Sequence, residues 1–255
     1  MRLLFIGDVV ANSGCEFLGS KLPLIKRQYN IDITVVNGEN SASGNGISPE
    51  SCDYLTRIGA DVITTGNHAF RRREAIDLFE RVPHLVRPAN YPSGVPGKGV
   101  YILDMGRYHV AVVNLMGTVY MESLANPFET AEELLKGIDT KNIIVDFHAE
   151  ASAEKKAMGY FLDGKVTAVL GTHTHVQTAD EQILPNGTAY ITDVGFTGPE
   201  NSVLGIKPEL TINMQRYKML VKFEEATPPC FINAVVIDFD EKTGKANSIE
   251  RLIIR

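Results

Sequence analysis

Residues 166–175 read Val-Thr-Ala-Val-Leu-Gly-Thr-His-Thr-His. The run Val166–Leu170 is short, β-branched and largely apolar, which predicts a strand that is covered on both sides. Gly171 permits a tight turn after it, and alternate residues of an extended segment share a face, so the imidazoles of His173 and His175 are predicted to point the same way. A chance His-x-His in a loop is common, so this stretch gains its meaning from the other predicted strands.

Polar side chains follow most of those strands directly. The strand ends read Gly7-Asp8 after Leu3–Ile6, Asn37-Gly38-Glu39-Asn40 after Ile33–Val36, Gly66-Asn67-His68 after Val62–Thr65, His148 after Ile143–Phe147, and Asp193 after Ala189–Thr192. In α/β sheets, ligands bind at the carboxyl ends of the strands. We therefore expect these carboxylate, amide and imidazole groups to line one crevice.

Each of these residues alone has an ordinary structural interpretation. An aspartate after a first strand, such as Asp8, is more often a cap or turn residue, and a single buried histidine such as His148 is often structural. His84 and His109 are interpreted as structural or solvated, and the run Arg71–Arg73 as a solvated helix start, with contact between one arginine and a substrate phosphate left open. The joint pattern, repeated in order along the chain, outweighs these separate interpretations.

The residue types favour one class of ion. Carboxylate, amide oxygen and imidazole together suit manganese, iron or zinc, whereas magnesium and calcium prefer shells made of oxygen alone. The number of candidate ligands exceeds what one ion uses, but two ions about 3.5–4 Å apart and bridged by a carboxylate would use them. The sequence therefore predicts a dinuclear transition-metal site, with iron or manganese favoured and zinc as an alternative.

Strands alternate with helical stretches, which indicates an α/β protein. Helices are predicted near Ser48–Ile58, Glu74–Arg81, Thr130–Lys136 and Ala151–Leu162, and Pro23 predicts a broken or late-starting helix between Glu16 and Tyr29. Residues 232–254 resemble an antiparallel hairpin. No linker or repeat divides the chain, so one domain spanning 1–255 is expected, and periodicity alone leaves a doubly wound sheet open.

Composition limits the partners. The net charge of −6 gives no global footprint for duplex DNA or anionic lipid, so we expect no stable nucleic-acid binding. A small phosphodiester substrate is compatible with this charge, because metal ions supply positive charge locally. The three cysteines form no CxxC pair, which indicates neither a thiolate zinc site nor a disulfide framework. No signal-peptide core or membrane span is visible, so a cytoplasmic protein without a membrane partner is expected, and homo-oligomerisation is left open.

At these motifs the chain resembles the calcineurin-like metallophosphoesterase superfamily. It is most similar to the YmdB-like branch, through the opening Gly-Asp-Val-Val, through Asn-Gly-Glu-Asn, and through Thr192–Pro199. The resemblance implies a four-layer α/β/β/α sandwich, in which two mixed sheets pack face to face with helices outside.

Two departures from the wider superfamily concern the metal ligands. Val9 and Val10 follow Asp8, so the usual histidine of Asp-x-His is absent, and Glu39 replaces the usual bridging aspartate. The resemblance implies that Asn40 substitutes as an oxygen ligand. The implied first metal site is Asp8, Glu39, Asn40 and His175, and the second is Glu39, Asn67, His148 and His173.

The hypothesised reaction is phosphodiester hydrolysis by a metal-held hydroxide. His68, beside the ligand Asn67, is the candidate general acid that protonates the leaving alkoxide. The YmdB-like resemblance implies a cyclic nucleotide phosphodiesterase, with 2′,3′-cyclic nucleotides favoured. A phosphomonoesterase or nuclease using the same metals, and a regulatory protein whose metal site is not used for turnover, are the alternatives.

Overall fold

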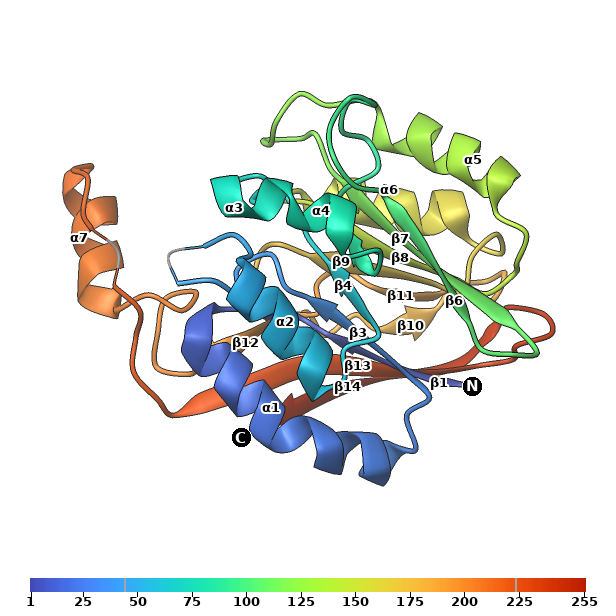
Figure 1. The fold of residues 1–255 in the computed structure, drawn as a ribbon, viewed down its shortest axis with the longest axis horizontal. Helices are drawn as coiled ribbons and strands as arrows, with labels where there is room; N and C mark the ends of the chain where they lie inside the picture. The colour runs from blue at the N-terminus through green and yellow to red at the C-terminus, as the bar shows by residue number, and fades with distance from the viewer. Residues whose placement is uncertain (44, 223) are drawn as a thin grey trace.

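Two β-sheets pack face to face in the computed structural model of the chain, which describes residues 1–43, 45–222 and 224–255 (Figure 1). The first sheet has the strand order β2-β12-β13-β1-β3-β4-β5. Strands β12 and β1 pair with one edge of the long strand β13, and β14 pairs with its opposite edge. Its strands are β1 (Arg2–Ile6), β2 (Asp8–Val9), β3 (Ile33–Asn37), β4 (Val62–Thr64), β5 (Leu85–Val86), β12 (Phe196–Pro199), β13 (Cys230–Phe239) and β14 (Ala246–Ile254). It is mixed, because β1, β3, β4 and β5 run parallel while β13 is antiparallel to β1, β12 and β14.

The second sheet has the order β10-β11-β9-β8-β7-β6. Its strands are β6 (Val100–Asp104), β7 (His109–Met116), β8 (Ile143–His148), β9 (Ala168–Thr172), β10 (Gln182–Ile183) and β11 (Ala189–Ile191). The four inner strands are parallel, and the edge strands β6 and β10 are antiparallel to their neighbours. This sheet is therefore mixed as well.

Strand β1 is apolar on both faces because its side chains are buried alternately on the two sides of the first sheet. Leu3 and Phe5 pack between the two sheets, where they join residues of β8 and β9 such as Ile144 and Leu170. Leu4 belongs to the other buried cluster, under the helices of the first sheet. Successive side chains of a strand point to opposite faces, so a strand with cover on both sides has no polar face.

Helices form the outer layers (Figure 1). They are α1 (Ala11–Tyr29), α2 (Pro49–Ile58), α3 (Arg73–Ile76), α4 (Leu78–Arg81), α5 (Pro127–Gly137), α6 (Ser152–Leu162) and α7 (Pro208–Tyr217). Leu22 of α1 and Leu55 of α2 pack on the first sheet, whereas Ala131 of α5 and Met158 of α6 pack on the second. The predicted α/β/β/α sandwich of two mixed sheets is confirmed.

Two helix predictions were wrong in detail. Helix α1 begins at Ala11 and continues through Pro23 to Tyr29. A proline inside a helix costs about 3 kcal/mol, but α1 buries Leu18, Leu22 and Ile25, and full burial of each such side chain contributes about 1.5–3 kcal/mol. The predicted helix Glu74–Arg81 is two short helices that meet at Asp77.

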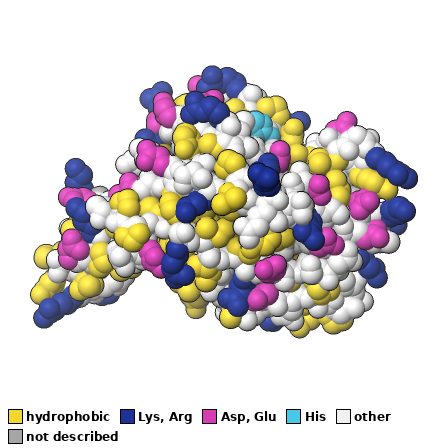
Figure 2. Space-filling model, turned by 90° about the horizontal axis from the view of Figure 1, so that it is seen from below, with side chains coloured by type: hydrophobic (Ala, Val, Ile, Leu, Met, Phe, Trp, Pro, Cys, Tyr) yellow, Lys and Arg dark blue, Asp and Glu magenta, His cyan; other side chains and the backbone are white. Residues whose placement is uncertain are grey.

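Helix α7 lies on an arm that projects from the body of the molecule (Figure 1), and hydrophobic and charged side chains are mixed on this arm in Figure 2. Within the described part of the chain, α7 has no buried residue, and Met219 and Leu220 beyond it are exposed. The helices described here are also too short or too polar to cross a membrane.

Candidate metal centre

Both sheets contribute to the predicted site. Asp8 lies in β2 directly after β1, Glu39 and Asn40 follow β3, and Asn67 follows β4, all on the first sheet. On the second sheet, His148 is the last residue of β8, and His173 and His175 follow β9. Because parallel strands present their carboxyl ends at one edge, the two sheets bring all of these side chains to one place.

The site is buried, although it is rich in charge. Asp8 and His148 are fully buried and Glu39 is 1% exposed. A charged group removed from water is costly unless it is paired or coordinates a metal, so this concentration of carboxylate and imidazole requires mutual compensation.

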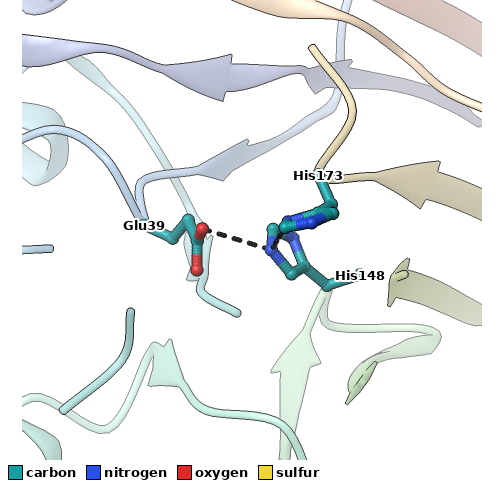
Figure 3. Close-up of side chains that lie close together, drawn as sticks. All are labelled: Glu39, His148 and His173. Carbon is teal, nitrogen blue, oxygen red and sulfur yellow. Dashed lines mark hydrogen bonds and ion pairs between the residues drawn. The ribbon is translucent and has the colours of Figure 1, made fainter. Parts of the chain in front are cut away.

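Three polar atoms lie close to the His148 ring nitrogen Nε2. This nitrogen lies 2.9 Å from Asn67 Oδ1, 3.1 Å from Glu39 Oε1 and 3.1 Å from His173 Nδ1. Figure 3 shows the side chains of Glu39, His148 and His173 pointing toward one another, and one ligand atom from each lies within 4.8 Å of the others. These atoms belong to the four residues of the predicted second metal site.

Hydrogen bonding alone cannot satisfy this group. His148 Nδ1 is 2.9 Å from Thr172 Oγ1, so one hydrogen-bond partner of the ring is already assigned. Its Nε2 faces two oxygens and a ring nitrogen, and a single N–H can donate well to only one of them. A cation between Asn67, Glu39, His173 and His148 would satisfy all four lone pairs, and thus the donor set fits a transition metal.

A second group of polar atoms adjoins the first through Glu39. His175 Nε2 lies 3.5 Å from Asp8 Oδ1 and 3.3 Å from Asn40 Nδ2, and Asn40 Nδ2 lies 3.3 Å from Glu39 Oε1. These are the four residues of the predicted first metal site. Glu39 Oε1 takes part in both groups, a position that suits a bridging carboxylate.

Asn40 is in the predicted place, but its amide is turned the other way. Its nitrogen faces Asp8, Glu39 and His175, and its oxygen lies 3.0 Å from His68 Nδ1. An amide coordinates a cation through oxygen, and the oxygen and nitrogen of a side-chain amide are assigned from their partners. Coordination by Asn40 therefore requires its amide to flip.

His68 lies beside these two groups. Its Nδ1 is 3.1 Å from Glu39 Oε1, its backbone N–H donates to Glu39 Oε2 at 3.0 Å, and its side chain is 27% exposed. The ring thus adjoins the predicted bridging carboxylate while part of it reaches solvent.

Burial and charge oppose each other in the titration of the site. Burial acts to raise the pKa of Glu39, but the imidazoles of His148 and His68 outweigh it and hold that pKa well below its usual range. For His148, burial acts to lower the pKa, but the carboxylates of Glu39 and Asp8 raise it to about 9. Burial and the neighbouring His148 lower the pKa of His173 to about 3. In the metal-free protein, carboxylates and imidazoles thus compensate one another.

Gly66 is required by this packing. A Cβ at residue 66 would lie 2.2 Å from His148 Cδ2 and 2.4 Å from Glu39 Oε2. Real Cβ atoms do not approach other atoms so closely, so the glycine of Gly66-Asn67-His68 leaves the space that the side chains of His148 and Glu39 occupy.

Three residues that support the site were missed by the sequence analysis. Asp146 is fully buried and accepts a hydrogen bond of 2.7 Å from Thr172, the same threonine that contacts His148. Glu150 Oε2 lies 3.0 Å from His173 Nε2, which leaves His173 Nδ1 to face the site. An aspartate in the middle of the apolar strand Ile143–Phe147 was the one available signal, since a buried carboxylate needs a polar partner.

Three other residues considered in the sequence analysis have side-chain partners outside the two groups of polar atoms. Arg72 donates to Glu74 at 2.9 Å and to the backbone oxygen of Ser43 at 3.0 Å. His84 contacts Thr56 at 2.9 Å and the exposed His109 lies 3.7 Å from Asp104, in agreement with their structural or solvated interpretation.

Comparison with known proteins adds a family. The model of a family described as YmdB-like protein matches residues 4–252. The 2′,3′-cyclic-nucleotide 2′-phosphodiesterase of Bacillus subtilis is 46% identical over 256 residues, covering 100% of this chain and 97% of that protein.

Solved structures agree in fold. The crystal structure of a novel phosphatase from Mycoplasma pneumoniae superposes with a TM-score of 0.95 at 34% identity, covering 100% of this chain and 93% of that one. The calcineurin-like phosphoesterase YfkN of Bacillus subtilis has a TM-score of 0.58 at 12% identity, covering 100% and 90%, and shows a shared fold alone. The predicted resemblance is confirmed: the chain belongs to the YmdB-like protein family.

Proposed function

We propose that this protein is a dinuclear metal-dependent phosphodiesterase that hydrolyses small phosphodiesters, with 2′,3′-cyclic nucleotides as the favoured substrates. The chain is a phosphoric ester hydrolase, as a YmdB-like protein with a metallophosphoesterase fold. The observation that supports two metal ions is the position of Glu39 Oε1. This atom lies 3.1 Å from His148 Nε2 in one group of polar atoms and 3.3 Å from Asn40 Nδ2 in the other.

The proposed ligands follow from these two groups. Asp8, Glu39, Asn40 and His175 would hold one ion, and Glu39, Asn67, His148 and His173 the other. Iron or manganese suits this mixture of nitrogen and oxygen donors, and zinc is the alternative. When bound, two such ions supply the charge that activates water and neutralises the phosphate oxygens.

His68 supplies the proton for the leaving alkoxide. Its Nδ1 lies 3.0 Å from the side-chain amide of Asn40 and 3.1 Å from Glu39 Oε1, so this nitrogen is already engaged, whichever way the amide is turned. The transferable proton then belongs on Nε2, for which the described residues offer no hydrogen-bond partner. A ring that is anchored at one nitrogen and 27% exposed is suited to donate from the other.

The variant His68→Ala tests this role. We expect it to retain two ions per chain and to lose about 10²–10⁴-fold in kcat, because general acid catalysis contributes that much. Metal content is measured by elemental analysis beside turnover, with His84→Ala as a histidine control away from the site. If His68→Ala also loses an ion, His68 is a ligand and the proposed acid role is wrong.

A substrate panel tests the preference for cyclic nucleotides. We expect 2′,3′-cyclic AMP to be hydrolysed with the highest kcat/KM, followed by bis(p-nitrophenyl) phosphate, with 3′,5′-cyclic AMP, p-nitrophenyl phosphate and short RNA slower. The Bacillus subtilis relative carries the 2′,3′-cyclic name, whereas the solved structure from Mycoplasma pneumoniae is described as that of a phosphatase. Faster turnover of p-nitrophenyl phosphate than of any diester would favour the second candidate, a phosphomonoesterase.

A further inference from the structure

A buried ion pair lies behind the His-x-His loop. Lys155 of α6 and Asp193 after β11 are each 1% exposed, and Lys155 Nζ lies 2.7 Å from Asp193 Oδ2. Burying both charges is costly, so a fully enclosed pair of this kind contributes little to stability by itself and calls for another reason.

Asp193 binds the residue between the two predicted histidine ligands. Its Oδ2 accepts hydrogen bonds from the backbone N–H of Thr174 at 3.1 Å and from the Thr174 hydroxyl at 2.6 Å. Its Oδ1 accepts from the backbone N–H of Gly195 at 2.8 Å. Lys155, Thr174 and Gly195 together surround the carboxylate, so its position is fixed from three directions.

The loop that Asp193 holds is strained. His173 has φ 98° and His175 has φ 62°, both in the region that side chains rarely adopt. Such conformations cost free energy and persist only where the surroundings enforce them. Thr174 lies between these two histidines, and its two hydrogen bonds to Asp193 anchor the loop.

Gly171 makes room for the same arrangement. A Cβ at this position would lie 3.0 Å from Lys155 Cδ and 1.7 Å from the backbone oxygen of Thr192. The aliphatic part of the Lys155 side chain therefore passes β9 at Gly171, where there is no side chain, and reaches Asp193.

We infer that Lys155 and Asp193 are positioning residues that hold Thr174, and through it His173 and His175, in the geometry needed to bind metal. Lys155 keeps the buried Asp193 carboxylate in place, and Asp193 in turn fixes the loop on which one predicted ligand of each metal site is carried. This inference rests on the ligand sets of the proposed function.

A matched pair of substitutions at Thr174 tests the inference with little disturbance of the core. Thr174→Val removes the hydroxyl donor and keeps the shape, whereas Thr174→Ser keeps the donor. Titration of the metal-free protein with Mn²⁺, followed by calorimetry, is expected to show about 10–100-fold weaker binding for Thr174→Val, as is usual when a partner of a ligand is lost, and near wild-type binding for Thr174→Ser.

The ion pair is tested in the same titration. Lys155→Met and Asp193→Asn are expected to weaken Mn²⁺ binding by at least as much as Thr174→Val, while Lys207→Met, which breaks the exposed Lys207–Glu224 pair, leaves it unchanged. If Lys155→Met and Asp193→Asn do not fold, the comparison of Thr174→Val with Thr174→Ser still tests the inference. Wild-type Mn²⁺ affinity in Thr174→Val, with only the melting temperature reduced, would overturn the inference and leave a purely structural ion pair.

His175→Ala separates this inference from the proposed function. Unchanged Mn²⁺ affinity in His175→Ala would reject the proposed ligand set itself. Loss of affinity in His175→Ala together with full affinity in Thr174→Val would reject the positioning role alone.

Discussion

Gly66 shows how closely the site is packed at the scale of single residues. It is the glycine against which His148 and Glu39 rest, and any side chain there would occupy the space of both. The motif Gly-Asn-His thus encodes an amide oxygen in Asn67, an imidazole in His68 and a position without a side chain.

The substitution Gly66→Ala is expected to displace His148 or Glu39 and to weaken Mn²⁺ binding by about 100-fold or more, since even loss of a ligand's supporting partner costs 10–100-fold. Overpacking should also lower the free energy of unfolding by about 1–3 kcal/mol. Gly94→Ala is the matched control, because a Cβ at Gly94 meets nothing within 4 Å. Calorimetric titration and chemical denaturation of both variants measure the two effects, and equal affinities would contradict the packing argument.

At the scale of elements, helix α2 follows its sequence signals closely. Ser48 is its N-cap and Pro49 its first residue, as the pattern predicted. The cap is reciprocal: Ser51 N–H donates to Ser48 Oγ at 3.2 Å, and Ser48 N–H donates to Ser51 Oγ at 3.0 Å. This short helix packs Cys52 and Leu55 on the first sheet, in which Glu39 follows β3 and Asn67 follows β4.

Ser48→Ala is expected to lower the free energy of unfolding by about 1 kcal/mol, because loss of the Ser48 hydroxyl leaves the backbone N–H of Ser51 without its acceptor. Urea denaturation measures the change. Ser152→Ala is the control, since Ser152 is exposed at the start of α6 and makes no side-chain hydrogen bond to the described residues. A loss equal to that of the control would show that the cap does not stabilise α2.

At the scale of the whole molecule, the site joins the two sheets. Asp8, Glu39 and Asn67 belong to the first sheet, and His148 and His173 to the second. Ions held between these residues would connect both halves of the sandwich, so metal binding and global stability should be coupled.

Addition of Mn²⁺ to the metal-free protein is therefore expected to stabilise the fold. When the free Mn²⁺ concentration is 100 times Kd, the free energy of unfolding is expected to rise by about 2.7 kcal/mol. For a chain of this size that corresponds to a rise in Tm of about 5–10 °C. Differential scanning calorimetry measures the rise, and the His148→Ala variant should show much less of it. An equal rise in that variant would place the Mn²⁺ at another site.

Local sequence patterns predicted the strands that carry the site, but they missed the edge strand β6 and the start of helix α1. The strands that carry the site, such as β1, β3 and β8, are apolar runs whose burial on both faces leaves little alternative. The edge strand β6 was not predicted, since its residues are mostly half-buried and Asp104 ends it in solvent. Helix α1 was placed too late because local propensity at Pro23 is outweighed by packing on the first sheet.

The sequence by itself determined which side chains stand at the carboxyl ends of the strands, because strand periodicity and glycine turns are local properties. It could not decide which of those ends meet. The contact of Glu39 with His148 joins residues 109 positions apart, as does the bond of Asn37 to Asp146. Only the packing of one sheet on the other creates such contacts. The direction of the Asn40 amide and the pairing of Lys155 with Asp193 also depend on neighbours that tertiary structure supplies.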